Sequence, residues 1–274
     1  MRAITVIAAA LVLALPLAAK TLDVGPRAKY HDIQSALTAA KATDVINVAA
    51  GLYELPNGIG IAKVGVTLQG AGADRTILDG KNNTEDVVSI LVPGVTVTGF
   101  TLRNGAGTGV SIKDSTNLCN INHNVIIGMP YPGVSIGSGS LFTVIDHNTF
   151  AKNDQFAVNA EDDDPGTEIT NNIFYMNGDE SPVFRSIISG GILGHVTSVK
   201  YNCFFGQPND SATAGTSSTN LRTDPMLVDP PNDFHLEDGS PCLGAASDGT
   251  DFGALGKGKN PTDEKPATKG AGGK

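Results

Sequence analysis

The acidic run at residues 161–164 is the densest group of potential metal ligands in this sequence of 274 residues. Carboxylate oxygens are the ligands that Ca²⁺ prefers in proteins, so the run predicts a calcium site. The run comes directly before a Pro-Gly turn, and a solvated acidic loop is the alternative interpretation. The predicted ligands are Glu161, Asp162, Asp163 and Asp164.

Two cationic side chains are candidates for chemistry beside that run. A lysine can remove a proton when its surroundings lower its pKa, and an arginine can hold a carboxylate. Lys200 lies two residues before Asn202, on the polar face of an expected strand, and Arg185 follows the segment 181–184. We therefore assign both as candidate catalytic residues. The alternatives are an ordinary exposed strand lysine and a plain loop arginine.

A pair of histidines occurs at equivalent positions 24 residues apart, His123 and His147. Two imidazoles on adjacent coils could share a metal ion, for which Asp146 is the nearest further ligand. The alternative is a stacked pair of turn histidines without a metal.

An internal repeat must position these groups. The segments 121–126, 145–150 and 169–174 follow one another at a spacing of 24 residues, the segment 97–102 precedes them by 24, and the segment 199–204 follows after 30. A second set, at 109–112, 133–136 and 157–160, has the same step of 24. Each repeat thus contains two short alternating strands and no room for a helix, which predicts a parallel β-solenoid.

Stacking of the repeats would align equivalent side chains in columns. One column faces inward, and another places Lys200 in line with Asn122, Asp146 and Thr170. A recurring asparagine fits a turn with a left-handed backbone, and its side chain can bond the next coil. The inward column is Leu102, Ile126, Phe150, Phe174 and Phe204, and the asparagines are Asn124, Asn148, Asn172 and Asn202.

The two ends of the repeat region differ from it. Residues 30–40 predict a short capping helix with Asp32 as its N-cap, and the Pro-rich sequence after Asn220 predicts an irregular C-terminal cap. Residues 1–19 have the pattern of a secretory signal peptide, and residues 256–274 that of a flexible tail. The expected organisation is a leader at 1–19, one all-β domain at 20–255 and a tail at 256–274.

Composition excludes some function classes. The formal net charge is −9 and the basic residues are scattered, which argues against nucleic-acid binding. The leader indicates an exported protein, periplasmic or extracellular, without a membrane span after cleavage. In an oxidising compartment Cys203 and Cys242 could pair and leave Cys119 buried, although three cysteines permit three single bridges.

Three segments resemble known proteins. Residues 32–54 (DIQSALTAAKATDVINVAAGLYE) and 66–80 (VTLQGAGADRTILDG) are similar to the opening of right-handed parallel β-helix proteins of the pectin-lyase-like superfamily. Residues 224–255 resemble the closing segment of bacterial exported β-helix repeat proteins. The resemblance implies a right-handed parallel β-helix. It leaves open lyase, hydrolase, esterase, epimerase and non-catalytic functions.

The resemblance implies a polysaccharide ligand, such as an acidic glycan of a cell surface, and a monomer. The sequence lacks the Gln-Asp motif of pectinesterases and the Asn-Thr-Asp triplet of polygalacturonases. The lyase interpretation has Ca²⁺ at residues 161–164 neutralise a uronate and Lys200 remove the C5 proton. The other interpretation is a non-catalytic surface module. In either case the predicted sugar-binding residues are Ser111, Ser135, Asn159 and Tyr175.

Overall fold

The computed structural model describes residues 18–83, 85–160, 166–178, 188–189, 196–206 and 217–258. Parallel strands form a stack of coils with three sheets, which we name A, B and C. Each regular coil contributes one strand to each sheet, so the coil has three strands rather than the predicted two. The segment predicted as one strand at 121–126 is divided between sheets A and B by a turn at His123 and Asn124.

Sheet A has eight parallel strands, and the register between neighbours shifts only once among the described residues, between Thr167 and Glu168. In spatial order they are β1 (Thr21–Val24), β2 (Val45–Val48), β5 (Thr67–Gly70), β8 (Thr96–Thr98), β11 (Asn120–Asn122), β14 (Val144–Asp146), β17 (Thr167–Thr170) and β20 (Val196–Lys200). The strands alternate between buried aliphatic and outward residues, as a sheet with one covered face requires.

Sheets B and C complete the coils. Sheet B consists of β3 (Gly51–Glu54), β6 (Thr76–Asp79), β9 (Thr101–Arg103), β12 (Val125–Ile127), β15 (Thr149–Ala151), β18 (Ile173–Tyr175), β21 (Cys203–Phe205) and β22 (Leu221–Arg222). Sheet C consists of β4 (Ile59–Ile61), β7 (Asp86–Ile90), β10 (Thr108–Ile112), β13 (Val134–Ile136), β16 (Val158–Ala160) and β19 (Ile188–Ser189).

The predicted inward column is confirmed, because its five residues are all buried and pair in register along sheet B. Phe150 stacks on Phe174 at 5.2 Å between ring centroids, and Phe174 on Phe204 at 4.8 Å. These offset stacks fill the narrow interior of the last coils without Trp.

The asparagine ladder is confirmed, but its backbone differs from the expectation. Asn148 Oδ1 accepts from the backbone N–H of Asn124, and Asn172 Oδ1 accepts from that of Asn148. The left-handed residue is the one before each ladder asparagine, such as Asn171 with φ 58°. The ladder asparagine is free to turn its amide inward because the preceding residue makes the turn.

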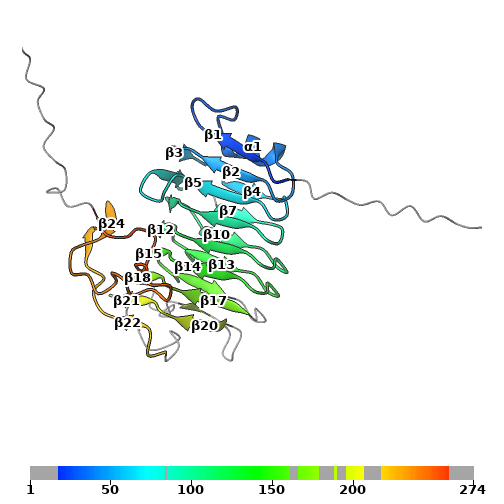
Figure 1. The fold of residues 1–274 in the computed structure, drawn as a ribbon. Coiled ribbons are helices and arrows are strands. Elements are labelled where there is room, and N and C mark those ends of the chain that lie inside the picture. Colours follow the sequence, from blue (N-terminus) through cyan, green and yellow to red (C-terminus); the bar gives the residue numbers. More distant parts are fainter. Residues whose placement is uncertain are drawn as a thin grey trace, which may run out of the picture.

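The short helix α1 (Ile33–Ala39) has Asp32 as its N-cap, as predicted, with Asp32 Oδ1 accepting from Ser35 N at 2.8 Å. Ile33, Ala36 and Leu37 are buried, and the helix contacts β1, β2 and β4 at the N-terminal end of the stack (Figure 1). Its role as a cap stays a prediction. No helix in the described ranges is long and apolar enough to cross a membrane.

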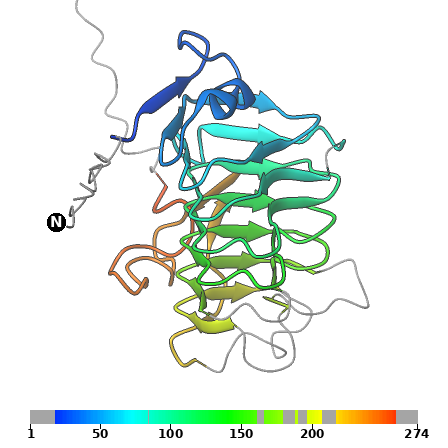
Figure 2. The same cartoon turned by 90° about the vertical axis from the view of Figure 1, so that its right-hand side faces the viewer.

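The C-terminal segment, residues 224–258, lies along the flank of the stack rather than across its end (Figures 1 and 2). It contains an antiparallel pair, β23 (Leu227–Asp229) and β24 (Asp233–Leu236). Gly253 N donates to Asn171 O and Ala254 N donates to Thr149 Oγ1. The predicted C-terminal cap is therefore a cover on the outer face of sheet B. The predicted leader and tail lie almost wholly outside the described residues.

Candidate functional site

Sheet A presents two outward columns of side chains over its eight strands. Most of the residues are polar and each is partly or fully exposed. The first column is Thr21, Val45, Thr67, Thr96, Asn120, Val144, Glu168 and Ser198. The second is Asp23, Asn47, Gln69, Thr98, Asn122, Asp146, Thr170 and Lys200. The predicted alignment of Lys200 with Asn122, Asp146 and Thr170 is thus confirmed.

The turn that follows each sheet A strand adds a third column, which we call the A/B corner. It contains Gly99, His123, His147, Asn171 and Tyr201, all with positive φ. His123 and His147 stack with ring centroids 5.0 Å apart and an interplanar angle of 4°. The predicted stacked pair of turn histidines is therefore what the structure shows.

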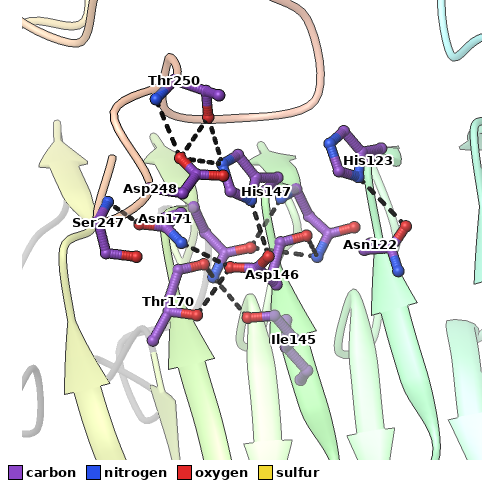
Figure 3. Close-up of polar contacts among 12 residues, drawn as sticks. Asn122, His123, Ile145, Asp146, His147, Thr170, Asn171, Ser247, Asp248 and Thr250 are labelled. Carbon is purple, nitrogen blue, oxygen red and sulfur yellow. Dashed lines mark hydrogen bonds and ion pairs between the residues drawn. The ribbon is translucent and has the colours of Figure 1, made fainter. Parts of the chain in front are cut away.

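Asp146, the last residue of β14, is the centre of a hydrogen-bond network at this corner (Figure 3). Its carboxylate accepts from His147 Nδ1 at 2.8 Å, from Thr170 Oγ1 at 2.7 Å and from Asn171 Nδ2 at 2.8 Å. Burial alone would raise the pKa of Asp146, but these bonds and the charge of His147 lower it. Asp146 is therefore a fixed carboxylate.

His147 is buried, with 5% of its surface exposed, and both ring nitrogens have partners. Nε2 lies 2.9 Å from Thr250 Oγ1, whose hydroxyl donates to Asp248 Oδ1. Since Oγ1 uses its hydrogen there, Nε2 must donate to it, and Nδ1 donates to Asp146. Burial alone would lower the pKa of His147, but the bond to Asp146 and the charges of Asp146 and Asp248 raise it. His147 thus ties the C-terminal segment to the coils through both of its ring nitrogens.

The connectivity Asp146–His147–Thr250 resembles a nucleophilic triad, yet it cannot act as one. A triad histidine accepts the hydroxyl proton of its nucleophile, whereas the Thr250 hydroxyl donates to Asp248. Both ring nitrogens of His147 already have partners, Asp146 and Thr250, so His147 offers no free nitrogen to a metal ion. No group of three or more potential ligands occurs within the described ranges.

His123 differs from its neighbour because it is exposed and belongs to a separate hydrogen-bond chain. Asn122 Nδ2 donates to Asn120 Oδ1 at 2.8 Å, so Asn122 Oδ1 faces His123 and accepts from Nδ1 at 3.2 Å. Loss of hydration against His147 lowers the pKa of His123, and the charge of His147 lowers it further. His123 is therefore a neutral imidazole whose Nε2 carries the lone pair.

The ladders hold this corner rigid. Asn148 Nδ2 donates to Ile121 O at 2.7 Å and to Asp146 O at 3.1 Å, so it fixes the backbone on either side of the histidine turns. A second ladder, which the sequence reasoning missed, links Asn153 to Asn177 through the same kind of bond. Their spacing of 24 residues is the signal that could have revealed it.

The predicted site residues are divided among the sheets. Lys200 is exposed on β20, the last strand of sheet A. Ser111, Ser135 and Asn159 form one column of sheet C, in which Ser111 is buried with 7% exposure. Tyr175 lies on the outer face of sheet B and stacks on Phe205 at 5.8 Å. They do not form one surface, because adjacent strands of a coil face different directions.

The remaining predicted residues lie outside the described residues. They are Arg185 and the metal ligands Glu161, Asp162, Asp163 and Asp164.

A cleft of about 570 Å³ lies between sheet B and the C-terminal segment, and it was not expected from the sequence. Ile77, Val125 and Ile127 line it from the coils, while Asp233 and His235 line it from the segment. The available signal was the apolar character of both faces of β12, Val125–Ile127, which requires a cover.

Comparison with known proteins agrees with this architecture. A family model described as "Right handed beta helix region" matches residues 85–220. The fold is therefore a right-handed parallel β-helix. The right-handed parallel β-helix that the resemblance implies is thus confirmed. No curated protein sequence matches this β-helix.

Several solved structures share the fold of this β-helix. The alginate lyase AlyGC of the PL6 family is 16% identical with a TM-score of 0.54, and the alignment covers 67% of this chain and 28% of AlyGC. An alginate lyase from Paenibacillus sp. str. FPU-7 is 16% identical with a TM-score of 0.50, with 68% and 76% covered. Pectin methylesterase from carrot is 15% identical with a TM-score of 0.41, with 68% and 72% covered. This β-helix thus spans little more than a quarter of AlyGC.

Proposed function

We propose that this protein binds an acidic polysaccharide along the outer face of sheet A and processes it there. The observation that carries the proposal is the register of the two outward columns over eight strands. Neighbouring strands lie about 4.8 Å apart, so the sheet repeats its hydrogen-bonding groups at intervals close to the length of one sugar unit. A polymer with repeating hydroxyl and carboxylate groups fits such a surface.

The fold comparison supports the choice of ligands. The two structures described above with TM-scores of 0.54 and 0.50 are both named alginate lyases. At 16% identity they support the fold and suggest alginate as the first polymer to test. Pectate is added because of the sequence resemblance to the pectin-lyase-like superfamily.

Calcium belongs to the same proposal. A chain with a net charge of −9 repels an anionic polymer, so a bridging cation would increase affinity. The sequence-predicted ligands at residues 161–164 would supply it, in a monomer exported to the periplasm or the outside of the cell.

Binding is tested by isothermal titration with alginate and pectate, with dextran as the neutral control, in the presence and absence of Ca²⁺. The double variant Gln69→Ala/Thr98→Ala removes two outward groups of sheet A and should weaken binding about tenfold. The matched variant Ser135→Ala/Asn159→Ala removes two groups of sheet C and should leave affinity unchanged. Binding that depends on sheet C instead, or no binding of either polymer, would contradict the proposal.

Processing is tested by the formation of an unsaturated product, which absorbs in the ultraviolet. The variant Lys200→Ala then tests whether Lys200 is the base that removes the C5 proton. Loss of product with retained binding supports Lys200, and retained product places the base elsewhere on sheet A. Binding without product would make the protein a non-catalytic glycan-binding module.

A further inference from the structure

We propose that His123 is the proton acceptor for β-elimination on a uronate polymer bound along sheet A. The inference rests on the proposed function and names the base that this function requires. It replaces Lys200 in that role.

The position of His123 suits a long substrate. His123 follows β11, the fifth of the eight strands of sheet A, so a polymer can occupy the sheet on both sides of it. Lys200 lies on β20, the last strand, three strands further along. A reaction at the centre of the sheet uses binding groups on both sides of the reacting sugar, which orients the bond to be broken.

The tautomer of His123 leaves the lone pair on Nε2, the ring nitrogen that is not used in the hydrogen-bond chain with Asn122. Nδ1 donates to Asn122 Oδ1, and Nε2 has no hydrogen-bond partner among the described residues. Asn122 is held in turn by Asn120. Asn122 is therefore a positioning residue, since it fixes which nitrogen of His123 accepts a proton.

The neighbouring charges keep His123 ready at neutral pH. His147 stacks on His123, and burial there disfavours a positive charge on His123. Charge on His147 disfavours it further, while Asp146 and Asp248 act in the opposite sense. The pKa of His123 is therefore below its ordinary value. A histidine can then accept a proton at neutral pH, whereas a lysine would first need its pKa lowered by desolvation. His147 is thus a second positioning residue, and it does not touch the substrate in this scheme.

The reaction step is a single elimination. His123 Nε2 takes the C5 proton of the uronate, and the electron pair of that C–H bond forms the C4–C5 double bond. The C4–O bond to the next sugar breaks, and its oxygen takes a proton from water. Asn120 uses its Oδ1 to accept from Asn122. In this scheme the Nδ2 hydrogens of Asn120 donate to the uronate carboxylate, where negative charge develops.

The decisive variant is His123→Asn. Asparagine fits the turn because Asn171 occupies the equivalent position with φ 58°, and His123→Gly is a second choice because Gly99 occupies it with φ 77°. His31→Asn is the matched control, an exposed histidine beside α1. We expect both His123 variants to lower kcat about 10²- to 10⁴-fold on alginate or pectate, with KM, affinity and circular dichroism retained. His31→Asn should behave as the wild type.

The pH profile separates the two bases. With His123 as base, kcat/KM rises with pH through a midpoint below the ordinary histidine pKa of about 6.5. With an ordinary lysine as base, activity would rise only toward pH 10. Lys200→Ala should keep the acidic midpoint. Wild-type rates in a His123→Asn variant, or a lysine-like profile, would overturn the inference.

Failure of the inference and failure of the proposed function give different results. Product formed at the wild-type rate by His123→Asn overturns the role of His123 and leaves the proposed function intact. Polymer binding without product overturns the role of His123 together with processing, and leaves glycan binding intact. Absence of binding to both polymers overturns both.

Discussion

Sheets A and B are built from the same coils, yet their outer faces differ. Sheet A alternates strictly, so that β11 buries Ile121 between two outward asparagines. Sheet B is apolar on both sides in its C-terminal half, where β18 buries Ile173 and Phe174 on opposite faces. The C-terminal segment packs on sheet B and forms a second apolar cluster there.

The difference shows how one repeat can serve two purposes. An outward side chain can contact a ligand only where no other part of the protein covers it. The C-terminal segment packs on sheet B and leaves the outer face of sheet A exposed. The two faces meet at the A/B corner. There His147 fastens the cover through Thr250, whereas His123, one coil earlier, stays exposed and is the base that we propose.

The strongest test of the comparison is Phe252→Ala in the C-terminal segment. Phe252 is 1% exposed within the cluster on sheet B, and loss of such a ring should cost about 3–5 kcal/mol in the free energy of unfolding. Urea denaturation measures this cost. Leu52→Ala, on β3 of the same sheet, is the control, because Leu52 is 53% exposed and should change stability by no more than about 0.5 kcal/mol. Equal effects would mean that the segment is not a cover.

A disulfide between Cys203 and Cys242 would fasten the cover covalently. Both thiols are buried, and a hydrogen bond between them, with burial, raises the pKa of Cys203. The folded protein should therefore oxidise slowly, while refolding with glutathione disulfide should form the bridge and add about 2–4 kcal/mol of stability. Peptide mapping without reduction identifies the pair.

The prediction for Cys119 is the opposite. Its thiol is buried, and burial raises its pKa to about 11. It should remain reduced after the same refolding, and a bridge that includes Cys119 would contradict the arrangement.

His147→Asn tests the electrostatic fastening of the cover. It should lower stability by about 1.5–3 kcal/mol, the range for a hydrogen bond to a charged group. Because folding raises the pKa of His147, its contribution is complete below the ordinary value of about 6.5 and is lost as the pH rises through the folded-state pKa. Urea titrations at a series of pH values should show this loss in the wild type and not in the variant.

The control for that profile is His123→Asn. The pKa of His123 is lowered by folding, so its contribution is present above about pH 6.5 and is lost as the pH falls. His123→Asn should keep the alkaline loss of stability. If both variants abolish it, the two histidines titrate as one unit and the separate roles proposed for them are wrong.

The smallest expected effect is that of Thr98→Ala on sheet A. Thr98 lies outward and partly exposed, so stability should change by no more than about 0.5 kcal/mol. Ile173→Ala, an outward position on sheet B, should cost about 2–5 kcal/mol because the cover buries that side chain completely. Similar losses at both positions would show that sheet A is also covered.

The sequence alone was sufficient for the features that recur. A spacing of 24 residues predicts the solenoid, the inward column and the asparagine ladder, because each depends on equivalent residues in successive coils. It also placed Lys200 in line with Asp146.

Features that depend on segments distant in the sequence could not be predicted in this way. Thr250 reaches His147 across 103 residues, and no local pattern indicates that contact. The recurring asparagine predicts the left-handed turn one residue too late. Asparagine favours both a left-handed backbone and a side-chain ladder, so the residue type alone does not distinguish the two. The structure shows that the ladder decided the position of Asn148, whereas His147, with φ 50°, makes the turn.

The asparagine ladder also bears on how such a chain changes length during evolution. Each rung joins residues 24 apart, and the rung from Asn172 to Asn202 joins residues 30 apart with the same bonds. The ladder therefore keeps its bonds when the number of residues between two rungs changes. Duplication of one whole coil would present the same amides to the coils above and below, so this architecture can gain or lose binding length in units of one repeat.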